Sequence, residues 1–372
     1  MLTELEIASH VVTGPGPCAF GALEKSQTGR GPVSALEDAI RPALVRPPCL
    51  VSFSGGHDSS LLLSLATRLA RREGHALPVP ITWRFTDAPD AEESEIQDAV
   101  VGALELEDWV RLQAGDDLDF VGPVALNVVA QHGLLFPGNA FLHAPLFEQA
   151  TGGSLITGYG GDQVLGRVWR RRRPWWLAEL DQGGDSFGWL RAAGRRRCVR
   201  SQARERHAVP RAYEVRGRWK AGRRNVACAR QSFRLIAEHY GCTPVHPLLD
   251  EAFVEALERS GLTPHSAGGR AVLVQALFGD LVPHACTVAR PKANLRQVFW
   301  RRHTQELVSH IDTSELASRV VDAAGLRREW DKPEPHTRTA LLVQRAWLMS
   351  NGIEFNGSGT STKTSCDSQR TA

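Results

Sequence analysis

The nine residues from Ser52 to Ser60, Ser-Phe-Ser-Gly-Gly-His-Asp-Ser-Ser, constrain the fold of this chain more than any other segment. They begin in a short apolar run at 50–53, which is typical of a buried strand, and they precede leucines and alanines at helical spacing over 61–70. Two adjacent glycines let the backbone turn tightly and approach a ligand, and the free N–H groups at a helix start attract anions. The segment is therefore predicted to be a strand-to-helix turn that binds an oxyanion such as phosphate.

Polar side chains in this turn add to its anion-binding character. Ser54, Ser59 and Ser60 supply hydroxyl donors, and Asp58 supplies one carboxylate. A carboxylate beside phosphate makes chemical sense chiefly as a ligand of Mg²⁺. The turn lacks the Gly-Lys-Ser/Thr ending of a Walker loop and the third glycine of a dinucleotide fingerprint, so it belongs to neither of those motifs.

A second glycine-rich turn, Thr-Gly-Tyr-Gly-Gly-Asp, occupies residues 157–162 and follows the apolar pair Leu155 and Ile156. Such a turn also occurs as a purely structural element in α/β proteins. However, the carboxyl ends of parallel strands meet at one edge of a sheet, so Asp162 is expected to emerge beside Asp58. The two carboxylates are then predicted to share one metal ion.

The alternation of strand and helix patterns between 48 and 165 predicts an α/β fold, a doubly wound parallel sheet with helices on both faces. Strands are expected at 50–53, 79–85, 109–112 and 154–157. The apolar spacing from about 226 to 350 is helical, which predicts a helical C-terminal lobe over the carboxyl edge of the sheet. Five segments follow from these patterns: an N-terminal arm (1–47), a nucleotide-binding core (48–166), an Arg/Trp-rich insertion (167–225), the helical lobe (226–355) and a disordered tail (356–372).

Taken together, the two turns resemble a known family of nucleotide-dependent enzymes. The first resembles the pyrophosphate loop, Ser-Gly-Gly-x-Asp-Ser, of the ATP pyrophosphatases (PP-loop proteins), which cleave ATP between the α and β phosphates. The second resembles the Ser/Thr-Gly-x-Gly-x-Asp signature of the asparagine synthetase C-terminal domain. Its Tyr159 stands where asparagine synthetases usually carry Glu and where β-lactam and carbapenam synthetases carry Tyr. The motifs of this chain also resemble those of lasso-peptide cyclases. The fold that the resemblance implies is adenine nucleotide α-hydrolase-like.

Further matches extend the resemblance over roughly 48–305. His246–Asp250 is similar to the family's Pro-x-Leu-Asp element, and Arg290-Pro291-Lys292 is similar to the β-lactam synthetase segment whose lysine stabilises the acyl-adenylate and the ring-closing transition state. An incidental surface lysine is the alternative reading of Lys292. The resemblance implies the cofactors ATP and Mg²⁺, catalytic roles for Tyr159 and Lys292, and metal binding by Asp58 and Asp162. It implies ATP or pyrophosphate binding by Ser52, Ser54, Gly55, Gly56, Asp58, Ser59, Ser60, Trp83 and Gly158.

Two departures from the family pattern qualify these roles. The cyclising synthetases pair the tyrosine with a glutamate, but the corresponding positions here hold Ala229, Arg230 and Gln231. Either another acid takes that place, with Glu205, Glu214 and Glu238 as candidates, or the base differs. Glutamine-dependent members also begin with a nucleophilic cysteine and a hydrolase domain, whereas this sequence starts Met-Leu-Thr, so the amine is expected from the substrate, from free ammonia or from a partner protein.

Composition places few further limits on the chain. Its 372 residues, 42% hydrophobic content and net charge of +3 are ordinary for a globular protein. No signal peptide and no apolar run of membrane-spanning length occurs, and the seven cysteines contain no Cys-x-x-Cys pair. These features predict a cytoplasmic protein without a disulfide framework or zinc site.

The Arg/Trp-rich insertion has three open interpretations. Residues 167–224 contain seventeen arginines and one lysine against five acids, with tryptophans interleaved. Arginine and tryptophan suit phosphate pairing and base stacking in RNA, and they equally suit an acidic peptide or carrier-protein partner. The third interpretation is a solvated helical surface with buried tryptophans.

The leading hypothesis is an ATP-dependent ligase that adenylates a small-molecule or peptide carboxylate and lets an amine displace AMP. The product would be an amide, including a lactam or peptide macrolactam in natural-product biosynthesis, with a partner protein supplying the amine or presenting the peptide. One alternative is an RNA-modifying PP-loop ATPase, although the paired cysteines of its sulfur-transferring members are absent. The other is a non-catalytic, degenerate paralogue.

Overall fold

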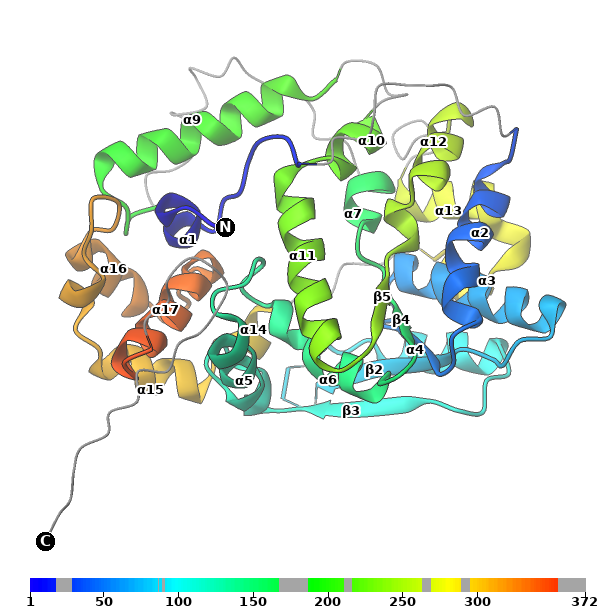
Figure 1. Ribbon diagram of the computed structural model, residues 1–372, viewed down its shortest axis with the longest axis horizontal. Coiled ribbons are helices and arrows are strands. Elements are labelled where there is room, and N and C mark those ends of the chain that lie inside the picture. Colours follow the sequence, from blue (N-terminus) through cyan, green and yellow to red (C-terminus); the bar gives the residue numbers. More distant parts are fainter. Residues whose placement is uncertain are drawn as a thin grey trace, which may run out of the picture.

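A five-stranded parallel sheet forms the centre of the protein (Figure 1). The computed structural model describes residues 1–17, 29–85, 87–88, 91–166, 187–210, 216–262, 269–288 and 295–353. The sheet has the strand order β3-β2-β1-β4-β5, and every neighbouring pair is parallel. Its strands are β1 (Cys49–Ser52), β2 (Val79–Phe85), β3 (Val110–Ala114), β4 (Ser154–Ile156) and β5 (Thr243–Val245).

Helices cover both faces of this sheet. Successive strand residues point to opposite faces, so Val51 and Ile156 join one buried core while Leu50 and Leu155 join the other. The first core is covered by α2 (Pro32–Leu44), α3 (His57–Glu73), α4 (Ser94–Ala103), α12 (Glu251–Arg259) and α13 (Arg270–Phe278). The second is covered by α5 (Pro123–His132), α6 (Ala144–Gln149) and α11 (Arg224–His239). The predicted α/β class with a parallel sheet is confirmed.

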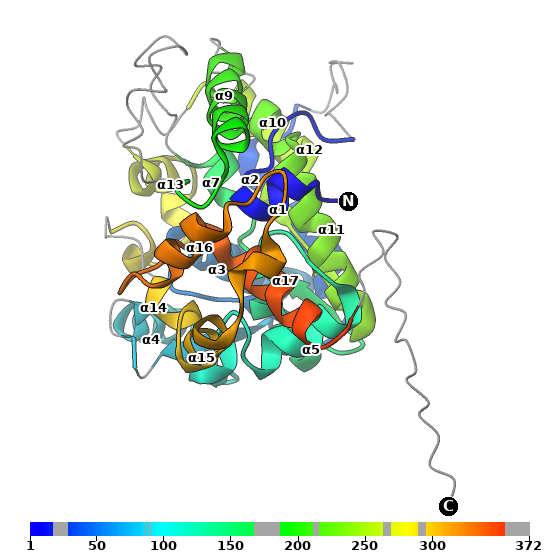
Figure 2. The same ribbon diagram turned by 90° about the vertical axis from the view of Figure 1, so that its left-hand side faces the viewer.

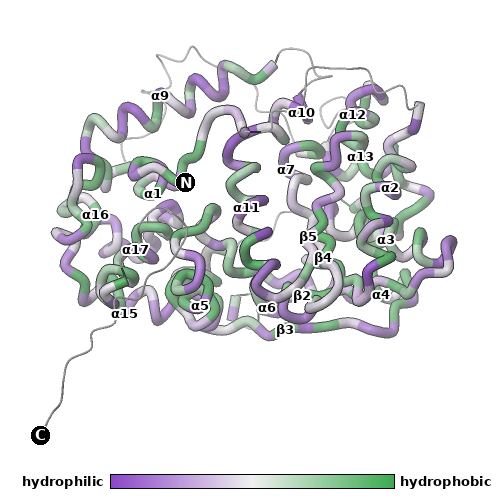
Figure 3. Tube along the Cα trace, viewed as in Figure 1, coloured by the Kyte–Doolittle hydropathy of each residue, from purple (hydrophilic) through white to green (hydrophobic). Residues whose placement is uncertain are grey.

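The second core continues into a helical lobe at one end of the molecule (Figure 2). In this lobe the first and last described helices meet, because α1 packs against α17. Trp189 also donates a hydrogen bond of 2.7 Å to the carbonyl of Ala8 in α1. The lobe contains α1 (Glu4–Ser9), α9 (Ala192–Ala208), α14 (Arg296–Phe299), α15 (Arg302–His310), α16 (Ala323–Trp330) and α17 (Ala340–Ser350). Much of α9 is hydrophilic (Figure 3).

Two local expectations differ from the structure. The segment 1–47, expected as an arm that packs on the core or frays, contains two helices, and α2 packs on the core against α3 and α12. Its helical pattern is easily missed because Pro42 interrupts it. The stretch expected to be helical from 226 also contains the short strand β5, which pairs only with β4 among the described strands. Proline has no backbone N–H to donate to a neighbouring strand. An edge strand tolerates Pro244 because β5 pairs with a described strand on one side and not on the other.

Several earlier expectations concern residues outside the described part of the chain. They are the disordered tail at 356–372, most of the tryptophan-containing segment at 167–186, and Lys292 with its neighbours Arg290 and Pro291. Within the described ranges, no helix has the length and apolarity needed to span a membrane.

Candidate nucleotide site

The two glycine-rich turns lie side by side at the carboxyl edge of the sheet. The first leaves β1 and starts α3, and the second leaves β4 and starts the short helix α7 (Gly161–Val164). Strands β1 and β4 are direct neighbours, with Val51 opposite Ile156. The chain order of the strands reverses between them, and ligands of open parallel sheets bind at such a switch point.

Hydrogen bonds within the first turn hold its shape. The amide of Gly56 donates to the Ser54 hydroxyl at 3.2 Å, and the Ser59 hydroxyl donates to the Gly56 carbonyl at 3.1 Å. Gly55 has a φ of 88°, a left-handed conformation that glycine adopts without strain. Ser60 is fully buried and donates to the Gly55 carbonyl at 3.1 Å, so its hydroxyl stabilises the turn instead of facing the cavity.

A cavity of about 660 Å³ opens over both turns. One part of its lining is polar and includes Ser52, Ser54, Gly56, Asp58, Ser59, Gly158 and Asp162. The other part is apolar and includes Ile81, Trp83, Phe85, Leu142, Leu146 and Leu295. The predicted binding residues therefore line the cavity except Gly55 and Ser60, which support the turn beneath it. The Trp83 ring is anchored by a 3.3 Å hydrogen bond to the Leu142 carbonyl.

Asp58 and Asp162 converge as the sequence predicted, and an arginine joins them. One guanidinium nitrogen of Arg270 lies 2.9 Å from Oδ2 of Asp58, and the other lies 2.7 Å from Oδ1 of Asp162. Gly161 permits this geometry because a Cβ atom there would lie 1.9 Å from the same Oδ2 atom. Nothing in the sequence had singled out Arg270, which begins α13.

A second unpredicted cation lies nearby. Lys220 belongs to α10 (Arg216–Ala221), which packs against α7 and so against the turn that carries Asp162. Burial lowers the pKa of Lys220 below its usual range, and the charges of Arg216 and Arg270 lower it further while Asp162 opposes them. Part of the Arg-rich insertion therefore brings positive charge close to Asp162 and Arg270, although Lys220 itself does not line the cavity.

Tyr159 lines the cavity in an aromatic environment. Its ring packs edge-on against Phe233 at 5.0 Å and against His246 at 5.9 Å. Burial raises the pKa of the Tyr159 phenol above its ordinary range, with the Cys228 thiol and the Asp162 carboxylate adding to the effect. The phenol is therefore held neutral.

None of the described glutamate candidates lies beside Tyr159. Glu205 pairs with Arg223 and accepts from the Gly14 amide at 3.0 Å, while Glu238 pairs with Arg234 on the surface of α11. Glu214 is outside the described residues. The charge that acts on Tyr159 from the expected position of the acid is that of Arg230, which lowers its pKa. The expectation that Glu205 or Glu238 completes a dyad is wrong.

Two histidines pack under the same region. Burial lowers the pKa of His246 to about 3 and that of His143 to about 4, so both rings are neutral at physiological pH. The Nδ1 atom of His246 lies 2.6 Å from the Thr157 hydroxyl, which also accepts from the Tyr159 amide at 3.3 Å. His143 lines the cavity, and its ring lies 4.5 Å from that of Phe233. The sequence had singled out His246 only as the residue that precedes the Pro-x-Leu-Asp element, and nothing in the sequence had singled out His143.

A second cavity of about 420 Å³ adjoins the first and shares Leu295 with it. Its walls come from the helical lobe and from the start of the chain, and they include His10, Phe120, Asn139, Phe299, His336, Thr337 and Ala340. No Asp, Glu, Lys or Arg lies among these described lining residues. The site thus combines a charged chamber at the sheet edge with a neutral chamber beside it.

The donor set suits a hard divalent cation shared with a ligand. Across the described ranges, no cluster of three or more His, Cys, Asp or Glu side chains forms a metal site of its own. Asp58 and Asp162 provide two carboxylates, and Mg²⁺ is commonly bound by one or two carboxylates together with phosphate oxygens and water. Searches of protein-family models and of curated proteins gave no match to this chain.

Proposed function

We propose that this protein is an ATP-dependent ligase that adenylates a carboxylate, releases pyrophosphate, and transfers the acyl group to an amine. The observation that carries the proposal is the convergence of Asp58 and Asp162, from two glycine-rich turns on neighbouring strands, at the polar end of one cavity. The five-stranded parallel sheet supports the finer assignment to an adenine nucleotide α-hydrolase-like fold.

The two parts of the larger cavity match the two parts of a nucleotide. The amides and hydroxyls of the first turn and the start of α3 would bind the β and γ phosphates. The apolar surface formed by Ile81, Trp83 and Phe85 would pack against adenine. Asp58 and Asp162 would hold Mg²⁺, which when bound neutralises charge on the phosphates.

The chain's own cations would then act on the reacting groups. A carboxylate is a poor electrophile, and its conversion to a mixed anhydride with AMP, with release of pyrophosphate, makes the attack of an amine feasible because AMP is a good leaving group. Lys220, which lies close to Asp162, with Lys292 by resemblance, would stabilise negative charge that develops on phosphate and acyl oxygens.

The neutral state of Tyr159 assigns it an orienting role toward the amine. A buried phenol with a raised pKa donates or accepts a hydrogen bond more readily than it removes a proton outright. The proton that leaves the amine would then need another acceptor. Two described imidazoles line the cavity, those of His57 and His143, and the neutral ring of His143 is the candidate that lies beside Phe233.

The neutral chamber gives the second substrate a place. ATP would fill the chamber over the two turns, and the carboxylate or its attached group would extend past Leu295 into the adjoining 420 Å³. The aromatic rings of Phe120 and Phe299, stacked at 5.5 Å, favour an uncharged organic group there. Such a chamber fits a small molecule or a peptide side chain.

Analysis of the nucleotide products tests the proposal. The purified protein is incubated with Mg²⁺, ATP and a panel of amino acids, carboxylic acids and peptides, and the products are separated by chromatography. AMP and pyrophosphate are expected with at least one carboxylate, and exchange of labelled pyrophosphate into ATP should depend on the same carboxylate. Formation of ADP and phosphate in their place would contradict the assignment.

One observation favours RNA modification as a second candidate. Helix α9 buries Gly194, Cys198 and Ala203 and exposes arginines on the rest of its surface, namely Arg195, Arg196, Arg197, Arg200, Arg204 and Arg206. A basic helix of this kind can bind a phosphate backbone. Filter binding of transfer RNA at two salt concentrations distinguishes the candidates, because retention that vanishes near physiological salt excludes specific RNA recognition by this surface.

A further inference from the structure

Arg270 occupies the point at which the two site carboxylates meet. Its side chain is 22% exposed and bridges Asp58, which is 16% exposed, to Asp162, which is 57% exposed. The fork of a guanidinium group suits two carboxylates at once, and pairs of this kind are stronger where solvent is partly excluded. In the free protein, both acids are therefore paired with one residue of the chain itself, and the three groups together carry a net charge of −1.

A metal ion and this arginine compete for the same atoms. Arg270 binds Oδ2 of Asp58 and Oδ1 of Asp162, and a cation shared by the two acids needs oxygens on the same facing edges. A guanidinium and a divalent cation also repel each other at such short range. The carboxylates can therefore hold the metal only after Arg270 has found another anion.

The cavity offers that anion a place next to Arg270. Arg270 lines the same cavity as Ser54, Ser59 and the start of α3, where the phosphates would bind under the proposed function. Arg270 is the first residue of α13, and its long unbranched side chain can change rotamer without a change in the helix.

We propose that Arg270 excludes the metal from Asp58 and Asp162 in the free protein and transfers to the triphosphate when ATP arrives, so that metal and nucleotide bind as one unit. This inference rests on the proposed function for the identity of the anion. Its competition part, however, stands on the two ion pairs alone. Binding of either partner then strengthens binding of the other by the same factor, as linkage requires.

Replacement of Arg270 by Met should change the two affinities in opposite directions. Methionine keeps an unbranched side chain of similar reach but removes the charge, so Mn²⁺, used as a spectroscopic probe for Mg²⁺, should bind more tightly without nucleotide. The expected gain is roughly 5–150-fold, the usual range of coupling between two sites. Binding of ATP should weaken because the contact between the guanidinium and the phosphates is lost.

The experiment titrates Mn²⁺ by electron paramagnetic resonance into the full chain, with and without a non-hydrolysable ATP analogue. Arg41→Met is the matched control, because Arg41 also bridges two acids, Asp38 at 2.5 Å and Glu73 at 3.0 Å, but on the outer surface of α2. The control should leave Mn²⁺ affinity unchanged. Adding Asp162→Asn to Arg270→Met should abolish the gain, which locates the metal at these carboxylates.

The outcomes separate this inference from the proposed function. Unchanged or weaker Mn²⁺ binding by Arg270→Met without nucleotide overturns the inference even if the protein forms AMP. A gain in Mn²⁺ affinity supports the competition even if no carboxylate supports AMP formation, in which case the proposed function fails by itself. Thermal unfolding checks that Arg270→Met is folded. If it is not, Arg270→Lys replaces it in the titration, because lysine keeps the charge without the forked geometry and should give a Mn²⁺ affinity between that of the wild type and the gain expected for Met.

Discussion

Two walls of the larger cavity carry opposite charges. The sheet-edge wall is formed by the turns at the carboxyl edge of the sheet, and the facing wall is the one opposite it. The positions of their charged residues depend on different parts of the sequence. The sheet-edge wall holds Asp58 and Asp162 on two turns that follow strands directly. The facing wall holds Arg270, which begins α13, and Lys220 of α10 lies close to Arg270 without lining the cavity; both helices are far from the two turns in the sequence. The comparison shows that a local motif can position the two carboxylates, while their countercharges depend on how α10 and α13 pack.

The strongest test of the sheet-edge wall is removal of a single carboxylate charge. Asp58→Asn should lower AMP formation by about 10²–10³-fold or more, because an oriented charge in a site that excludes water is worth about 3–4 kcal/mol. Asp162→Asn should have a smaller effect, since Asp162 is more exposed than Asp58.

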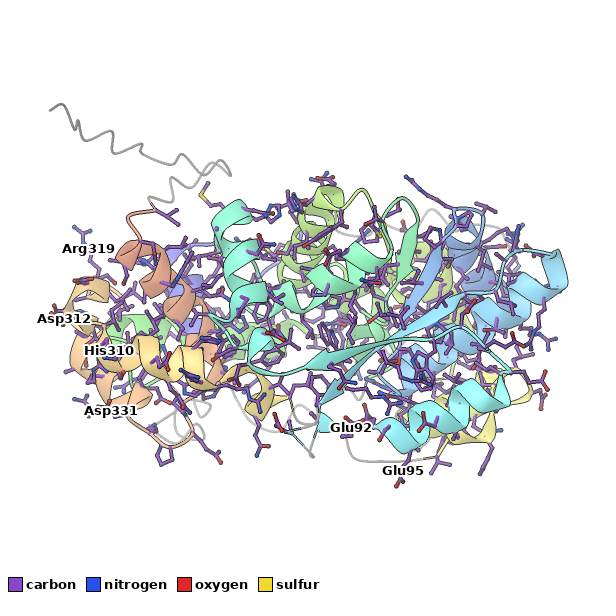
Figure 4. All side chains as sticks on the ribbon, turned by 90° about the horizontal axis from the view of Figure 1, so that it is seen from below. Glu92, Glu95, His310, Asp312, Arg319 and Asp331 are labelled. Atoms are coloured by element: carbon purple, nitrogen blue, oxygen red, sulfur yellow. The ribbon has the colours of Figure 1, made fainter. Side chains whose placement is uncertain are left out.

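Steady-state kinetics with the substrate found in the product assay measures this effect. Asp331→Asn is the control, since Asp331 lies at the outer end of the helical lobe (Figure 4) and pairs only loosely with Arg327 at 3.8 Å. Activity of Asp58→Asn within tenfold of wild type would mean that the carboxylate is structural.

Acidification should weaken the protein through two buried histidines, one beneath the sheet-edge wall and one that lines the smaller cavity. Burial lowers the pKa of His246 to about 3, below the sheet-edge wall, and that of His10 to about 4, where its Nε2 accepts from the Gly138 amide. The unfolded chain takes up these protons below its ordinary pKa of about 6.5, and the folded chain does not. Stability is therefore fully present above about pH 6.5 and is lost as the pH falls through about 4 for His10 and about 3 for His246, by at most roughly 3 and 5 kcal/mol respectively.

Urea unfolding of wild type and His10→Asn at pH 7 and pH 4.5 checks this sign. The substitution is expected to cost some stability at both values, and the decisive quantity is the difference between them. That difference should shrink by roughly 2–3 kcal/mol in the variant. An equal difference in both proteins would show that His10 titrates normally in the folded state.

A methyl group at Gly161 should disturb the sheet-edge wall by steric means alone. Its Cβ would lie 1.9 Å from Asp58, so Gly161→Ala must displace the carboxylate and is expected to lower activity by roughly 10²-fold. Gly102→Ala is the matched control, because no atom lies within 4 Å of its added Cβ in helix α4. The control should gain roughly 0.5–1 kcal/mol of stability without loss of activity. Comparable activity of the two variants would contradict the proposed role of the close approach.

The smallest expected effect is on ATP affinity and comes from Lys220, which lies close to Arg270 of the facing wall. Lys220→Met should weaken ATP binding by about tenfold, since a half-buried ammonium that contacts phosphate is worth on the order of 1.5 kcal/mol. Isothermal titration with an ATP analogue measures it, and Lys332→Met, which removes an outer pair with Glu329, serves as the control. An unchanged affinity for the ATP analogue in Lys220→Met would show that Lys220 does not act on the phosphates.

Sequence patterns predicted the sheet-edge wall because its geometry is local. The strands at 50–53, 79–85 and 154–157 and the helix after the first turn agree with the structure to within a few residues. Parallel strands deliver their carboxyl ends to one edge, so the meeting of Asp58 and Asp162 followed from the order of apolar runs and glycines. The role of Ser60 was not accessible in this way, since burial of a hydroxyl depends on the residues packed above it.

The facing wall was decided by tertiary structure alone. Arg270 is one of many arginines and has no local signal that distinguishes it, and Lys220 lay in a segment whose charges looked uniform along the sequence. Glu205 was a plausible partner for Tyr159 by residue type, yet packing of α9 pairs it with Arg223. Backbone geometry is set by neighbours along the chain, whereas the partner of a charge is set by which distant helix is packed within a few ångströms of it. The sequence by itself therefore determined where the carboxylates emerge, and only the tertiary structure determined which cations face them.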